Sequence, residues 1–175
     1  MLNNSATRTE RRYSLQNRLA IKIRWQGELA PPMTTRINHL AVWILVIADQ
    51  VIGALWYSQY LFGDAWLGYH GKIMTDITNP TNPTPFVVSI VAAIVTNYAL
   101  AWIIGKLQAL NAVAGLKVAL VCWFAFLFAS YATIEAFSAF GRNPATIIAI
   151  NMGYTLLIFA AGGLVLGAWR RGAAA

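Results

Sequence analysis

Hydrophobic residues gather in four long runs along this chain, and polar residues are concentrated before and between them. The runs cover residues 40–57, 86–104, 113–134 and 145–169. Each is near the ~20 residues with which an α-helix crosses about 30 Å of hydrocarbon. The pattern predicts an all-α membrane protein with four transmembrane helices. Short connections after the second and third runs favour an antiparallel up-and-down bundle.

Composition agrees with this assignment. Hydrophobic residues make up 58% of the 175 residues and charged residues only 11%. After Leu40 the charged side chains are too few to cover the surface of a soluble domain of this length. We therefore expect two regions, a basic cytoplasmic arm at residues 1–36 and a four-span transmembrane domain at residues 37–172.

The basic residues predict how the spans are oriented. Seven of the thirteen Lys and Arg residues precede the first run, two flank the connection at 105–112 and two follow the fourth run. Only Lys72 and Arg142 lie in the other connections. Cytoplasmic loops carry the excess of Lys and Arg, so this distribution places both termini in the cytoplasm.

Aromatic residues near the ends of the runs support the same orientation, because indole and phenol rings favour the membrane interface. An outer group consists of Trp56, Tyr57, Tyr60, Trp66 and Tyr69, and an inner group of Trp43, Trp102 and Trp169. Trp123 alone falls in the middle of a run. We interpret Trp123 as a large side chain that fills space in the core or faces lipid.

The arm mixes basic and apolar residues in a pattern suited to an anionic membrane surface or a partner protein. Pro31 and Pro32 separate it from the first span, because proline interrupts a helix. A disordered tail that only sets orientation is the alternative. The candidate binding residues are Arg11, Arg12, Arg18, Lys22, Arg24 and Trp25.

Asp49 is the most unusual residue of the spans. It lies near the predicted bilayer midplane, where a carboxylate costs several kcal/mol unless it is paired or neutral. Asn97 of the second span lies within roughly one turn of the same depth. We expect a protonated Asp49 to be hydrogen-bonded to Asn97, in a structural role between helices. The alternative is a site for a proton or a cation.

A second polar group is predicted toward the outer leaflet. It comprises Ser58 at the end of the first span, Ser130 and Glu135 on the third, and Asn151 on the fourth. These side chains either line an outward vestibule or bind a lipid headgroup, or they are simply solvated at the interface.

Small residues mark where helices approach closely. Gly163 and Gly167 form a GxxxG pair in the fourth span, which predicts a helix contact within the bundle or with a neighbouring subunit. Gly53 follows Asp49 by four residues, so both lie on one face of the first span. We expect that face to be packed.

Residue patterns of catalysis or metal binding are not recognisable in the sequence. Cys122 is the only cysteine, and His39 and His70 fall on opposite sides of the predicted membrane. Glycine-rich phosphate loops, Cys/His clusters and HExxH spacings are not found. We expect that the protein is not an enzyme and that it holds no metal and no cofactor.

The run Gly53-Ala54-Leu55-Trp56-Tyr57-Ser58, followed by Phe62, Gly63 and Trp66, resembles a bacterial membrane family, domain of unknown function 1761. Asn151-Met152-Gly153-Tyr154 and the later Gly163, Gly167 and Trp169 are similar to the last span of that family. The resemblance covers about residues 37–171 and omits the arm. It implies a four-span fold and no established activity. We expect the chain to lie in a bacterial inner membrane, cytoplasmic or intracytoplasmic. Gln59 stands where the family usually has proline, and a charged residue at Asp49 departs from its pattern.

Two functional hypotheses follow. The first is an accessory or scaffolding subunit of a larger membrane complex, for example a photosynthetic or respiratory one. Its partners would be membrane lipids and other membrane subunits bound through the arm and the fourth span. Pigment contacts would arise only inside such a complex, and no nucleic acid is expected. The second is a small permease or carrier coupled to protons or cations, using Asp49, Asn97 and the outer polar group.

Overall fold

The computed structural model describes Gln16 and residues 36–78, 82–109, 111–138 and 143–169. The chain divides into two units, Met1–Thr34 with Ala175 and Thr35–Ala174, and every element below belongs to the second. The described residues are all helical or irregular, without strands. The six candidate residues of the basic arm, from Arg11 to Trp25, lie outside the described residues.

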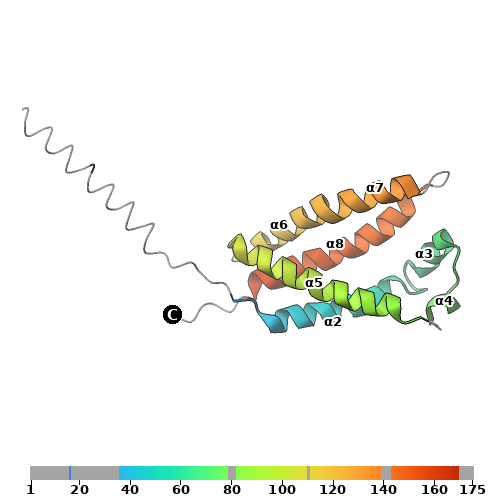
Figure 1. Ribbon diagram of the computed structural model, residues 1–175, viewed down its shortest axis with the longest axis horizontal. Helices are drawn as coiled ribbons and strands as arrows, with labels where there is room; N and C mark the ends of the chain where they lie inside the picture. Colours follow the sequence, from blue (N-terminus) through green and yellow to red (C-terminus); the bar gives the residue numbers. More distant parts are fainter. Residues whose placement is uncertain (1–15, 17–35, 79–81, 110, 139–142, 170–175) are drawn as a thin grey trace, which may run out of the picture. The chain divides into compact units, whose positions relative to one another are not determined.

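Four helical spans form the second unit (Figure 1), and each is long and apolar enough to cross a membrane. They are α2 (His39–Trp56), α5 (Thr84–Lys106), the third span Ala112–Ser138, and α8 (Ala145–Ala168). Two short helices, α3 (Gly63–His70) and α4 (Thr75–Thr78), lie between α2 and α5. The four predicted spans are confirmed, with ends that shift by no more than four residues.

The third span changes its helical form partway along. It consists of α6 (Ala112–Cys122), a π-helical segment η1 (Trp123–Phe128) and α7 (Ala129–Ser138). A π-helical segment adds a residue to the turn and is often found at functional sites. It also changes which residues of α7 face α8.

An asparagine lies just before each span, and its side chain accepts a hydrogen bond from a backbone N–H at the start of that helix. Asn38 accepts from Ala41 at 3.4 Å, and Asn111 accepts from Ala114 at 2.9 Å. Asn82 and Asn143, each followed by proline, accept at 2.9 Å from Thr84 and Ala145. The first N–H groups of a helix have no partner inside the helix, so these side chains satisfy donors near the ends of otherwise apolar helices.

α6 and α8 pack closely because glycines remove side chains from their contact. A Cβ on Gly163 would lie 2.6 Å from the Ala119 Cβ, and one on Gly167 would lie 2.5 Å from the Asn111 carbonyl oxygen. Gly163 and Gly167 thus lie at a close helix contact within the chain. Gly115 and Ala119 supply the α6 side of this contact. This face of α8 is therefore occupied by α6 rather than by a neighbouring subunit.

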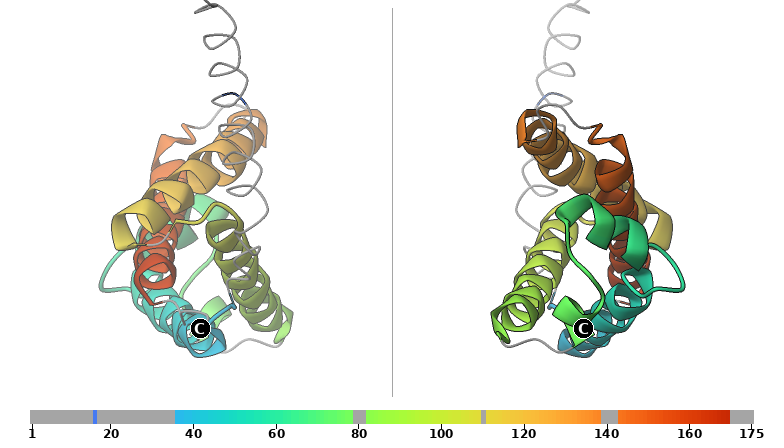
Figure 2. Two further views of the ribbon diagram at one scale, coloured as in Figure 1. Left: turned by 90° about the vertical axis from the view of Figure 1, so that its left-hand side faces the viewer. Right: turned by 90° about the vertical axis from the view of Figure 1, so that its right-hand side faces the viewer.

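The buried core lies mainly between α2, α5 and α8. The views along the helices show that α5 lies beside α2 and that α6 packs against α8 (Figure 2). The members of the core include Val42, Leu45, Leu100, Ile104 and Phe159. The first part of α5 lies outside this core, because every residue from Thr84 to Ala92 is exposed. That segment contributes little to the core.

Candidate functional site

Asp49 lies in the middle of α2 and is paired with α8. Its side chain is only 8% exposed. The Tyr154 hydroxyl lies 2.5 Å from Asp49 Oδ1 and 3.1 Å from the Asp49 main-chain oxygen, so it can donate to either. Ten residues of helix, about 15 Å, separate Asp49 from His39. The buried carboxyl group is therefore near the centre of the span.

Gly53 makes room for this contact. It lies one turn after Asp49, and a Cβ there would lie 3.0 Å from the Tyr154 hydroxyl oxygen. Asp49 and Gly53 thus both face Tyr154 on one side of α2. Tyr154 is the residue packed against it.

Asn97 has a different environment from the one expected. Its side chain is 2% exposed, and its amide donates to the Ala93 carbonyl of the same helix at 2.9 Å. A Cβ on Gly162 would lie 3.7 Å from Asn97 Oδ1, which places this amide at the contact between α5 and α8. The expected hydrogen bond between Asp49 and Asn97 is replaced by one to Tyr154, because each side chain meets a different part of α8.

A second line of hydrogen bonds lies beyond Asp49, toward α3. The Tyr57 hydroxyl donates to Asn151 Oδ1 at 2.9 Å, and the Asn151 amide donates to the Tyr131 hydroxyl. Tyr131 in turn hydrogen-bonds to Glu135, one turn further along α7. The Tyr69 hydroxyl of α3 lies 3.5 Å from Glu135 Oε2. The end of α2, α3, α7 and α8 are therefore joined through one carboxylate, one amide and three phenols.

The two lines meet through aromatic rings. Tyr57 and Tyr154 pack edge to face, with ring centroids 5.5 Å apart. We call the whole set the polar column: Asp49, Tyr57, Tyr69, Tyr131, Glu135, Asn151 and Tyr154. Phenols stay protonated near neutral pH, so they act as donors to the carboxyl groups.

This arrangement limits the chemistry of the column. The Asp49 carboxyl group accepts a hydrogen bond from Tyr154, whereas Glu135 is paired with Tyr131 and lies 3.5 Å from the Tyr69 hydroxyl. The Asn151 amide separates Tyr57 from Tyr131, and an amide N–H does not readily release its proton near neutral pH. The column thus suits binding of a proton or cation at Asp49 better than fast proton transfer along its whole length.

The predicted outer polar group is only partly assembled. Asn151 and Glu135 belong to the polar column and are connected through Tyr131. Ser58 instead donates to the Leu55 carbonyl at 2.7 Å and accepts from the Tyr60 N–H, so it stabilises the turn after α2. Ser130 is exposed on α7.

That turn is built by the aromatic motif of residues 53–66. Trp56 donates to the Ile150 carbonyl of α8 at 3.1 Å and packs on Phe62 with ring centroids 4.6 Å apart. Gly63 is buried, and a Cβ there would lie 2.6 Å from the Ser58 carbonyl oxygen. Trp66 packs edge to face with Tyr57. The motif therefore orients Tyr57 toward Asn151.

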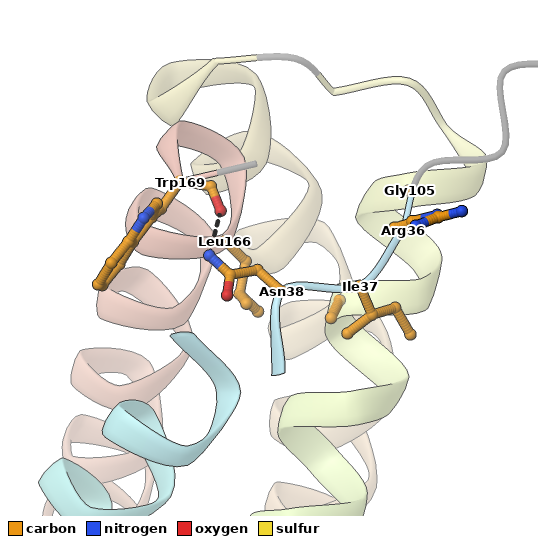
Figure 3. A pocket seen from close by; sticks show the side chains of 7 residues that line it. Arg36, Ile37, Asn38, Gly105, Leu166 and Trp169 are labelled. Atoms are coloured by element: carbon orange, nitrogen blue, oxygen red, sulfur yellow. Dashed lines mark hydrogen bonds between the residues drawn. The ribbon is translucent and has the colours of Figure 1, made fainter. Parts of the chain in front are cut away.

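The opposite end of the bundle contains a small cleft (Figure 3). It is lined by Arg36, Ile37, Asn38, Ala101, Gly105, Leu166 and Trp169. Its interior has room for little more than a water molecule. The Asn38 amide donates to the Trp169 carbonyl oxygen at 3.1 Å, which links the start of α2 to the end of α8.

Other candidate residues have ordinary contacts. His39 is exposed and lies 3.0 Å from the Tyr98 hydroxyl through Nδ1. The Trp123 indole donates to Thr155 at 2.9 Å, which connects η1 to α8. Cys122 is a free thiol. Within the described ranges, no three His, Cys, Asp or Glu side chains are grouped as metal ligands.

Sequence reasoning identified Asp49, Asn151 and Glu135 and missed the phenols that join them. Tyr131 precedes Glu135 by four residues, a helical spacing that could have paired them. Tyr57 was assigned to the membrane interface, although it is half-buried and bonded to α8. No sequence signal relates Tyr154 to Asp49, because their contact depends on how two distant helices are aligned.

Comparison with known proteins supports the resemblance seen in the sequence. A family model described as "Protein of unknown function (DUF1761)" matches residues 40–167, which include α2 to α8 almost completely. No curated protein and no solved structure gives a match. Asp49 and the motif residues from Gly53 to Trp66 all lie inside the matched range, as does Tyr154. The chain therefore belongs to the DUF1761 family of proteins of unknown function.

Proposed function

We propose that this protein is a bacterial inner-membrane protein whose four spans alternate in direction, with both termini in the cytoplasm. The end of the bundle with Arg36, Lys106 and Lys117 would face the cytoplasm under the positive-inside rule. Hydrogen bonds from Asn38 to Trp169 and from Trp56 to Ile150 support the alternation. They join the start of α2 to the end of α8, and the end of α2 to the start of α8.

Within that membrane, the protein serves as an accessory or scaffolding subunit of a larger complex and not as an enzyme. The observation that carries this proposal is the exposure of α5 from Thr84 to Ala92. A helix packed in a bundle normally buries one stripe of side chains. This segment buries none, and its exposed residues include Phe86, Val88 and Val91. The face is therefore open to a helix of another subunit.

Photo-crosslinking can separate a protein neighbour from lipid at this face. A photoreactive amino acid would replace Val88, which is 58% exposed on α5, and in a matched variant Val121, which is 66% exposed on α6. We expect a discrete protein adduct from Val88 and only lipid adducts from Val121. A native mass in gentle detergent equal to one chain, with no protein adduct from Val88, would end the accessory-subunit proposal.

The basic arm is proposed as a second attachment to the complex. Its residues Arg11 to Trp25 combine positive charge with apolar side chains. Deleting residues 1–30 should release the protein from its complex while the four spans remain folded. Retention of the truncated chain in the complex would restrict the attachment to the spans.

A second candidate function, a carrier coupled to protons or cations, is favoured by the buried pair of Asp49 and Tyr154. Intramembrane carboxyl groups often mark ion or proton paths. In proteoliposomes with a pH-sensitive dye, a carrier would collapse an imposed proton or cation gradient. The Asp49→Asn variant would fold and lose that flux. If the wild-type protein leaves each gradient unchanged, the carrier candidate fails while the accessory role stands.

A further inference from the structure

The strongest feature outside the polar column is the end of the bundle where α2 begins and α5 and α8 end. Three helix ends meet around the small cleft described above, which we call the Arg36 cleft. Arg36 lies beside Gly105 of α5, and Trp169 lies on the other side of Asn38 (Figure 3). The cleft is thus bordered by a cation, an indole ring and apolar side chains.

Positive charge at this end is not neutralised by the described part of the chain. Arg36 and Lys106 have no acidic partner among residues 36–78, 82–109, 111–138 and 143–169. The described acidic residues are Asp49 in the middle of α2, Asp64 in α3, Asp76 in α4 and Glu135 in α7. Lys106 follows Gly105 directly and lies 5.9 Å from the centroid of the Trp102 ring.

Large apolar side chains are exposed near the helix ends that form the cleft. Trp102, Trp169 and Leu107 are 57%, 46% and 62% exposed, and on α2 Leu40 and Trp43 are 52% and 48% exposed. Indole rings beside basic groups are typical of the layer where lipid headgroups meet acyl chains. A ligand at this place would therefore contact cations at one end and apolar side chains at the other.

We propose that the Arg36 cleft binds the phosphate group of an anionic phospholipid. The phosphate lies across the mouth of the cleft, since the interior holds little more than a water molecule. Arg36 donates to its oxygens, and guanidinium groups suit phosphate geometry. Lys106 adds positive charge, and the acyl chains run along Leu40 and Trp43. Basic pockets between spans are known sites of this kind. The inference requires only that the helices cross a membrane, and not the accessory role.

The test compares two variants that lose the same charge. Arg36→Gln changes the cleft, and Lys117→Gln removes one exposed cation of α6 that does not line the cleft. Native mass spectrometry of the full chain would measure binding of phosphatidylglycerol and of phosphatidylcholine. We expect wild type to prefer phosphatidylglycerol, and Arg36→Gln to bind it about fivefold more weakly. Lys117→Gln should resemble wild type, and Arg36→Lys should keep part of the preference.

The basic arm is present in every variant, so its general attraction for anionic lipid cancels in the comparison. If Arg36→Gln and Lys117→Gln lose the same affinity for phosphatidylglycerol, the effect is one of net charge alone and the proposal is overturned. Displacement of the lipid by millimolar inorganic phosphate, with retained binding of that ion, would also overturn it by identifying a site for free phosphate. Monodisperse elution of each variant on gel filtration confirms that folding is not the cause.

Discussion

The Tyr154 hydroxyl lies 2.5 Å from Asp49 Oδ1, and this contact joins the centre of α2 to α8. The same hydroxyl lies 3.1 Å from the Asp49 main-chain oxygen. A carboxyl group in the middle of a span needs a partner, because lipid offers none. Tyr154 is the partner in this chain, and Gly53 leaves the space that its hydroxyl occupies.

We predict that Tyr154→Phe destabilises the protein by about 1–3 kcal/mol, since it leaves a buried carboxyl group without its donor. Asp49→Asn should cost less, because its amide oxygen still accepts from Tyr154. Unfolding in detergent, followed by circular dichroism, measures both. Tyr60→Phe is the control, as Tyr60 is 81% exposed. If Tyr60→Phe loses as much stability as Tyr154→Phe, Tyr154 is not the stabilising partner of Asp49.

The outer part of the polar column should contribute to stability in a similar way. Asn151→Ala removes both hydrogen bonds that link Tyr57 to Tyr131, and we expect a loss of about 1–2 kcal/mol. Ser130→Ala should change stability by less than about 0.5 kcal/mol, because Ser130 is exposed on α7. If the two variants melt at the same temperature, Asn151 has no role in joining these helices.

Alanine substitutions at two adjacent glycines of α8 should differ sharply in their effect on stability. Gly163→Ala places a Cβ 2.6 Å from the Ala119 Cβ and 2.7 Å from the Gly115 carbonyl oxygen, so α6 and α8 must separate. We expect a loss of about 2 kcal/mol or more. A Cβ in Gly162→Ala would lie 3.2 Å from the end of the Leu100 side chain and 3.7 Å from Asn97 Oδ1, so this variant should stay within about 1 kcal/mol of wild type. Equal stability of the two variants would refute this packing.

α3 offers a second matched pair of glycines. A Cβ on Gly63 would lie 2.6 Å from the Ser58 carbonyl oxygen, whereas one on Gly68 would meet no atom within 4 Å. Gly63→Ala should therefore disturb the turn that orients Tyr57 and lower the melting temperature. Gly68→Ala should leave it unchanged or raise it, since alanine favours a helix by about 1 kcal/mol over glycine. The opposite order would exclude a structural role for Gly63.

The proposed orientation can be tested with single cysteines after Cys122 is replaced by alanine. Lys72 lies between α3 and α4, and Gln108 lies between α5 and α6. Both residues are exposed. A membrane-impermeant maleimide should label Lys72→Cys in intact cells, and Gln108→Cys only after the membrane is opened. Labelling of Gln108→Cys alone in intact cells would reverse the topology.

Local information in the sequence was sufficient for the spans and for the family. An apolar run of about 20 residues is predicted as a helix in lipid because a helix satisfies its own backbone hydrogen bonds. The four predicted runs therefore correspond to α2, α5, the third span and α8, with ends that differ by a few residues. Gly163 and Gly167 likewise marked a close helix contact, because a glycine pair four residues apart lets another backbone approach.

Only the tertiary structure decided which residues meet. The sequence predicted Asp49 and Asn97 at similar depth, yet Asp49 contacts Tyr154 and Asn97 lies near Gly162, about 12 Å further along α8. Hydropathy locates the spans, but it does not specify how far one helix is shifted along another, how each helix is rotated or which neighbour a residue faces. Those are set by the fit of side chains across α2, α5, α6 and α8, with the glycines of α8 allowing the closest approach. Tyr154, Tyr57 and Tyr131 became partners of the carboxyl and amide groups through that fit.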